Sequence, residues 1–265
     1  TQIPRLYLAH ISEKSNMTHR VHPYIFRIGQ LTTWKSRWFS AKRFQQYLRE
    51  DTLLREFLER RLRSSHIERV EIERSPASIH VIIKTARPGI LIGRGGEGAT
   101  RLKQEIERFI ARVARRWHAS GGRRETGFTV VEKRDRAKAA TSKKSAEVKL
   151  TIEEVRYPET HSAIAAQMIA DDLEKRLPFR RLLRQALDKI AASKTVQGVK
   201  ISLKGRLDGA EMARYEWAKK GRIPLQTIRA DVDYAEKTAY TSYGTIGVKV
   251  WIYKGDVFAD AKTRV

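Results

Sequence analysis

The sequence of 265 residues has no cysteine, comparatively few acidic residues and no long hydrophobic run. The absence of cysteine excludes disulfide bonds, cysteine-ligated zinc, iron–sulfur clusters and a thiol nucleophile. No apolar stretch approaches the roughly 18 residues that a membrane span needs. Residues 1–16 also lack the basic start and apolar segment of a signal peptide. We therefore expect a soluble, cytoplasmic protein with no membrane partner.

Basic residues dominate the charge of the chain. There are 54 Lys and Arg against 30 Asp and Glu, which gives a formal net charge of +24. Such a field favours a polyanionic partner, most often nucleic acid; an anionic membrane surface and an acidic protein are the alternatives. The length corresponds to about two domains, and 41% of the residues are hydrophobic. Each domain can therefore bury a core.

Residues 1–41 are predicted to be an N-terminal extension followed by an extended arm. Basic residues in the arm are interleaved with Phe and Trp, which suits phosphate contact combined with base stacking. The alternative is that the aromatic side chains pack on the following domain. The candidate RNA contacts in the arm are His22, Arg27, Lys35 and Arg37. His19 precedes His22 by three residues, but no third ligand is near in sequence, so a phosphate or backbone contact is favoured over a metal.

Residues 42–157 have the pattern of an α+β domain. Residues 42–63 are helical in pattern, and Asp51 is expected to be the N-cap of a second helix there. A glycine loop and then a long helix follow the second strand of this domain. The strands are predicted near residues 67–74, 79–84 and 148–152.

The most informative motif of this domain is the loop Ile92-Gly93-Arg94-Gly95-Gly96. Its I-G-x-x-G pattern is that of KH domains, where glycines let a sugar-phosphate backbone approach the main chain closely. Arg94 adds charge, and the N-terminus of the next helix adds a partial positive charge. Residues 90–92 are expected to form an apolar groove for bases. If residues 89–92 form a short helix, the order of elements is that of a type II KH domain.

Two other interpretations of the loop remain open. Gly93, Gly95 and Gly98 satisfy the G-x-G-x-x-G string of dinucleotide-binding proteins. However, Pro88-Gly89 interrupts the strand that should lead into the first glycine, and the stretch about 20 residues further on is basic where an acid is required. The second alternative is a plain glycine turn between a strand and a helix.

Residues 112–146 differ in composition from their surroundings. They contain eleven Lys and Arg against three acids, a net charge of +8. Few of them suit a core, so we expect a basic insertion in the KH-type domain that is disordered in the free protein.

Residues 158–265 are predicted to form a C-terminal α/β sandwich. Helices are expected near 160–177 and 179–192, separated by Pro178, and a third helix near 209–219. The strands are predicted at residues 199–204, 227–234 and 247–253.

The helix predicted at 179–192 separates its apolar and basic residues. At about 100° per residue, the apolar residues from Phe179 to Ile190 share one face, and three arginines lie on the other. These are Arg180, Arg181 and Arg184. Periodicity alone favours a solvated or rRNA-covered face over one with a specific role.

Several motifs, in order along the chain, resemble the family of bacterial small-subunit ribosomal protein number three. They are Val21-His22-Pro23, residues 26–29, Thr85–Gly89 with the glycine loop, residues 205–214, Gly221–Leu225, Arg229–Asp231, Tyr243-Gly244 and Ile246–Gly255. The chain departs from that pattern at residues 1–16, at 112–146, and at Asp208, where the family often has glycine.

This resemblance implies an α+β protein in the head of the small ribosomal subunit. It would bind small-subunit rRNA, line the mRNA entrance and help to open structured mRNA. The implied neighbours are proteins ten and fourteen in the head and four and five at the entrance. The resemblance assigns the mRNA-facing role to Arg180, Arg181 and Arg184, and it implies rRNA contacts for the glycine loop and the arm.

A catalytic function has little support in the sequence. There is no G-x-x-x-x-G-K-[S/T] phosphate loop, and no cofactor or metal is expected. Paired acids such as Asp171 with Asp172 suit solvated faces or arginine partners. Two rivals remain: a free KH-domain regulator of mRNA, and a nucleic-acid enzyme acting on damaged DNA, an activity credited to distant relatives of the family.

Overall fold

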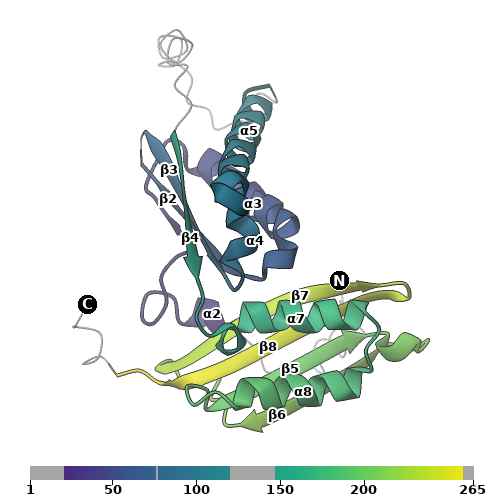
Figure 1. Cartoon of the computed structure of the whole chain (residues 1–265). Coiled ribbons are helices and arrows are strands. Elements are labelled where there is room, and N and C mark those ends of the chain that lie inside the picture. Colours follow the sequence, from purple (N-terminus) through teal and green to yellow (C-terminus); the bar gives the residue numbers. More distant parts are fainter. Residues whose placement is uncertain (1–20, 76, 120–146, 259–265) are drawn as a thin grey trace, which may run out of the picture.

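The computed structural model describes residues 21–75, 77–119 and 147–258. They form two α+β units, each a four-stranded sheet with helices against one face (Figure 1). The first unit and the arm before it comprise α2 (Pro23–Phe26), β1 (Ser36–Arg37), α3 (Phe44–Arg61), η1 (Arg63–Ser65), β2 (Ile67–Arg74), β3 (Ser78–Thr85), α4 (Pro88–Ile92), η2 (Arg94–Gly96), α5 (Glu97–Ala119) and β4 (Glu147–Glu154). The second unit comprises η3 (Pro158–Thr160), α7 (Ser162–Glu174), α8 (Phe179–Ala191), β5 (Gly198–Gly205), η4 (Leu207–Gly209), β6 (Arg214–Gly221), β7 (Ala230–Thr241) and β8 (Gly244–Asp256).

The first unit confirms the expected order of elements for a type II KH domain. From α3 to β4 the order is helix, two strands, two helices and a strand, and residues 88–92 form the short helix that this order requires. The sheet order is β1-β2-β3-β4, with β2 and β3 antiparallel and β3 and β4 parallel. Alternate residues of β3 are buried, because Ile79, Val81 and Ile83 face the helices.

The expected role of Asp51 as an N-cap is wrong. Helix α3 is continuous, and Asp51 lies in its middle, fully buried. Its carboxylate accepts hydrogen bonds from the indole of Trp38 and the hydroxyl of Ser36, both at 2.8 Å, and it pairs with Arg74. The helical pattern of residues 42–63 therefore corresponds to one helix and not two, and its Leu54 and Leu58 are both buried.

Helix α5 corrects the start of the predicted basic insertion. The helix runs to Ala119, and Val113 is buried, so residues 112–119 belong to the KH unit. The apolar period of the preceding turns continues across the point where the composition changes. Residues 120–146, which make up the rest of the predicted insertion, lie outside the described residues.

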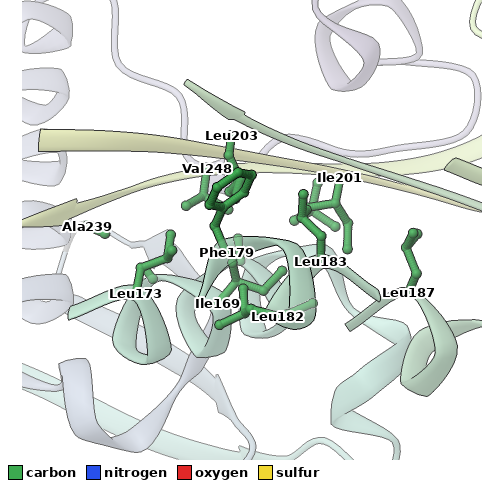
Figure 2. Packing of buried hydrophobic residues seen from close by; sticks show 14 of the residues in the cluster. Ile169, Leu173, Phe179, Leu182, Leu183, Leu187, Ile201, Leu203, Ala239 and Val248 are labelled. Carbon is green, nitrogen blue, oxygen red and sulfur yellow. The ribbon is translucent and has the colours of Figure 1, made fainter. Parts of the chain in front are cut away.

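The second unit is a two-layer sandwich in which α7 and α8 cover one face of an antiparallel sheet (Figure 1). Its strand order is β6-β5-β8-β7. Figure 2 shows Phe179 of α8 pointing toward Leu203 and Val248 of the sheet. Leu183 points toward Ile201. The predicted apolar face of α8 is thus confirmed as the face that packs on the sheet.

The helix predicted at 209–219 is wrong. Residues 207–209 form a single 3-10 turn, and residues 214–221 form strand β6, which pairs along its length with β5. Asp208 stands in the turn with a φ of 51°, a left-handed conformation that Asp tolerates better than most residues. It can therefore occupy a turn position that otherwise favours glycine.

The described residues include no helix long and apolar enough to cross a membrane.

Candidate nucleic-acid interface

The glycine loop has a backbone that only glycine adopts readily. Gly93, Gly95 and Gly96 have φ values of 68°, 62° and 81°. A Cβ placed on Gly95 or Gly96 would meet no atom within 4 Å, so the main chain here borders open space. Arg94, between Gly93 and Gly95, is exposed. The loop can therefore accept a closely approaching phosphodiester backbone beside a cation.

Gly98, in the first turn of α5, fixes the loop against the domain. A Cβ on Gly98 would lie 2.5 Å from the carbonyl oxygen of Leu91 and 2.9 Å from that of Ile92. This close approach packs α4 on α5 and holds both ends of the loop. Because α4 separates β3 from Gly93, no strand leads directly into the first glycine, and the dinucleotide-binding interpretation fails.

The expected apolar groove beside the loop is corrected in one position. Leu91 is only 5% exposed and belongs to the core of the KH unit. Ile90 and Ile92 are 56% and 41% exposed. These two side chains are the apolar surface that the loop offers to a base.

The structure gives Arg27 a packing role in place of the predicted rRNA contact. The residue is 1% exposed, and its guanidinium donates hydrogen bonds to five backbone carbonyl oxygens. The shortest, at 2.6 Å, joins its Nε to the carbonyl of Ala230 in β7. The other acceptors are the carbonyls of Pro23, Pro224, Leu225 and Thr227. Arg27 therefore anchors the arm to the second unit, and burial shields its guanidinium from RNA.

The other three arm candidates remain at the surface, each with partners in the protein. His22 caps α2, because its Nδ1 accepts a hydrogen bond from the Ile25 N–H at 3.4 Å. Burial, and secondly the charge of Lys35, lower the pKa of His22. The Lys35 Nζ lies 5.2 Å from the ring centre of Tyr24. Arg37 pairs with Glu71 and Glu73.

The three arginines of α8 lie together on the exposed face of that helix. Arg180, Arg181 and Arg184 are all exposed, whereas Phe179 and Leu183 beside them are each 6% exposed. Among the described residues no ion pair or side-chain hydrogen bond engages these three guanidinium groups; Arg180 lies 5.7 Å from the ring centre of Phe179. Their positive charge is therefore available to an external anion.

The structure contains a further basic and aromatic cluster that the sequence did not predict. On the face of the second sheet opposite α7 and α8, the Lys200 Nζ lies 5.2 Å from the ring centre of Trp217 and 5.3 Å from that of Trp251. Aromatic and polar residues alternate in 214–221, which is the pattern of a strand, whereas the composition of 209–219 favours a helix.

The glycine loop between α4 and α5, within this order of helices and strands, defines a KH-domain RNA-binding protein. In agreement, residues 53–160 match the family model described as KH domain, and residues 169–252 match that of ribosomal protein S3, C-terminal domain. Small ribosomal subunit protein uS3 of Caldicellulosiruptor saccharolyticus is 42% identical over 242 residues, which are 91% of this chain and 94% of the relative. The proteins of the same name from Myxococcus xanthus and Koribacter versatilis are each 39% identical, over 91% and 94% of this chain and 94% and 96% of their own.

The chain therefore belongs to the family of small ribosomal subunit protein uS3. This family consists of ribosomal proteins with a structural rather than an enzymatic role. Its bacterial members are cytoplasmic, because bacterial ribosomes are in the cytoplasm.

Proposed function

We propose that this chain, a structural protein of the small ribosomal subunit, binds small-subunit rRNA in the head and lines the mRNA entrance, where it helps to open structured mRNA. The observation that carries the mRNA-facing part is α8. Its apolar face is buried against the sheet, and Arg180, Arg181 and Arg184 project from the other face with no ion pair or side-chain hydrogen bond among the described residues.

Such a cluster acts on mRNA by binding phosphates. Arginine forms short, charge-assisted hydrogen bonds with phosphate oxygens. Three guanidinium groups on one rigid helix hold the strands of an opened hairpin by their backbones, which favours the separated state without reading sequence. The sequence has no nucleotide phosphate loop, so the work of opening comes from movement of mRNA through the ribosome.

The glycine loop is the proposed rRNA contact of the KH unit. Gly93, Arg94, Gly95 and Gly96 combine open main-chain space with one exposed cation, which suits a sugar-phosphate backbone. His22, Lys35 and Arg37 are secondary candidates. Contacts with small-subunit proteins ten and fourteen in the head, and four and five at the entrance, are proposed from the family resemblance.

The experiment that tests this function replaces Arg180, Arg181 and Arg184 with alanine. The buried face of α8 is untouched, so the variant should assemble into small subunits normally. Ribosomes that carry it should translate mRNA with stable hairpins several-fold more slowly, and unstructured mRNA at the normal rate, since each lost phosphate contact removes about 1 kcal/mol or more. Translation rates on the paired templates give the measurement.

A triple substitution of the same residues by lysine is the matched control. Lysine keeps the three charges and should retain most of the rate on hairpins. Equal slowing of the alanine variant on both templates, or its failure to assemble, would contradict the mRNA-facing role and indicate an rRNA contact. A chain that does not sediment with the small subunit in high salt would favour the rival, a free KH regulator.

A further inference from the structure

The face of the second sheet opposite α7 and α8 carries a row of aromatic and basic side chains across its strands. Lys200 of β5 stands opposite Trp251 of β8, and Trp217 of β6 pairs with the next outward residue of β5, Ser202. Lys200 lies between the two indole rings, at 5.2 and 5.3 Å from their centres. Tyr234 of β7 continues the row, with its ring centre 5.3 Å from that of Trp251.

The arm covers the β7 end of this face. The ring of His22 packs edge-on against Tyr234 at 4.7 Å, and Arg27 fixes the arm to β7 through Ala230. The β6 end has no such cover among the described residues, since Tyr215 and Trp217 are each 50% exposed. We call the uncovered part the sheet platform, and it consists of Lys200, Lys204, Tyr215, Trp217, Lys219 and Lys249.

The charge of the sheet platform is strongly positive. It has four lysines, and one of them is paired with an acid of β7: the Glu236 carboxylate lies 3.2 Å from the Lys249 Nζ. Lys204 and Lys219 are exposed, and within the described part of the chain neither has an ion-pair partner. The platform therefore offers uncompensated cations on both sides of an exposed indole ring.

We propose that the sheet platform binds single-stranded RNA as a second contact, separate from the glycine loop and from α8. This inference deepens the proposed RNA-binding function and rests on it. A base stacks on Trp217, and the flanking phosphates lie beside Lys204 and Lys219. Interleaved aromatic and basic groups on a groove or sheet are how proteins hold single strands with little sequence preference. A protein partner fits less well, because lysine is depleted from protein–protein interfaces.

The test measures the affinity of the full chain for a fluorescein-labelled 12-nucleotide oligouridine at several salt concentrations. The background is the Arg94→Asp, Gly95→Asp double variant, which removes the glycine-loop contact. In that background, Lys204→Ala with Lys219→Ala should weaken binding about tenfold and reduce the slope of log affinity against log salt by about 1.4, or 0.7 for each lost phosphate contact.

Substitution of the aromatic ring should have a different signature. Trp217→Ala should weaken binding about fivefold or more, because stacking contributes roughly 1–3 kcal/mol per base. It should leave the salt slope unchanged, since no charge is lost. Trp217→Phe keeps a stacking surface and should recover most of the affinity. Thermal unfolding of each variant shows whether the sheet is intact.

Lys220→Ala is the matched control. It lies next to Lys219 on β6 but on the helix side of the sheet, where its Nζ lies 3.0 Å from Asp188. It should change neither the affinity nor the salt slope.

The proposal would be overturned by unchanged binding in the lysine pair and in Trp217→Ala, or by no binding of oligouridine in the background variant. Either result would favour a protein partner for this face. Failure of the glycine-loop role would be seen separately, as a background variant that binds as well as the unmodified chain.

Discussion

At the scale of single residues, Arg27 is the most consequential side chain that the structure reveals. It is buried, and the five carbonyl oxygens that it satisfies come from the arm, from the loop before β7 and from the start of β7. A cation in such a position contributes more to the stability of the fold than an exposed one, because its removal leaves desolvated acceptors without a donor.

We expect Arg27→Ala to lower the free energy of unfolding by about 2–4 kcal/mol. Arg27→Lys should recover little of it, because a single ammonium cannot reproduce the planar set of donors. Arg37→Ala is the control: its side chain is 50% exposed, so the loss should be under about 1 kcal/mol. Urea denaturation of the three variants is the measurement, and equal losses for Arg27 and Arg37 would contradict the packing role.

The sequence could not distinguish Arg27 from its neighbours in the arm. Arg27, Lys35 and Arg37 share one local pattern of basic and aromatic residues. Arg27 differs from the other two because it meets a set of carbonyl groups near residue 230. Local sequence has no information on such distant acceptors. The aromatic residues of the arm likewise divide by tertiary contact: Trp38 packs on α3, whereas Phe39 is 95% exposed.

At the scale of elements, the glycines where α4 leads into α5 have two different roles. Gly98 packs α5 against α4, whereas Gly95 and Gly96 border open space and are candidates for RNA binding. Gly98→Ala should lower the free energy of unfolding by about 1–3 kcal/mol, since its Cβ would collide with the backbone of α4. The Arg94→Asp, Gly95→Asp variant should remain folded, at a cost of about 1–2 kcal/mol for the left-handed residue, because that Cβ meets nothing.

RNA affinity should distinguish the glycine loop from Gly98, provided that the variants stay folded. The Asp double variant should weaken the affinity for oligouridine, because it puts negative charge where a phosphate would lie. Thermal unfolding together with RNA titration gives both quantities. An unchanged affinity in a well-folded double variant would refute the glycine loop as an RNA contact.

Elements with a clear hydrophobic pattern, α8 and strands β2 to β5 among them, could be predicted, and β6 could not. The period of 179–192 predicted both faces of α8 correctly, because its apolar face packs on a sheet and its arginine face is exposed. Residues 209–219 contain Ala, Glu and Met, which favour a helix, yet residues 214–221 form a strand. Pairing with the whole of β5 outweighs that weak local preference.

At the scale of the whole molecule, ion pairs join the two units. Arg63 of the KH unit pairs with Asp171 and Glu174 of α7 at 3.1 and 2.6 Å. The His161 Nδ1 lies 3.1 Å from the carboxylate of Glu68 in β2. Burial opposes ionisation of Glu68, but His161 and Arg69 outweigh it and lower its pKa from 4.5 to about 2.

The stability of the folded chain should therefore depend on pH through Glu68. Because its pKa is lower in the folded state, the carboxylate stabilises the fold fully above about pH 4.5, and this contribution is lost as pH falls to about 2. We expect Glu68→Gln to be less stable at neutral pH by on the order of 2 kcal/mol and to converge with the unmodified chain near pH 2. Denaturation midpoints across this range are the measurement.

Glu73→Gln is the control for this prediction. The Glu73 side chain is 39% exposed and pairs with the exposed Arg37, so its removal should change stability little at any pH. A constant difference between Glu68→Gln and the unmodified chain from neutral pH to pH 2 would contradict the assignment of the low pKa to Glu68.

The anchor of the arm also has a consequence for biosynthesis. Arg27 and its acceptor Ala230 are 203 residues apart in sequence. At a synthesis rate of about 5–20 residues per second, roughly 10–40 s separate the making of the donor from the making of its acceptor. During that interval the KH unit can complete its own sheet and helices, whereas the guanidinium remains hydrated. The arm is thus synthesised well before the strand on which it docks, and it docks only after that strand has formed.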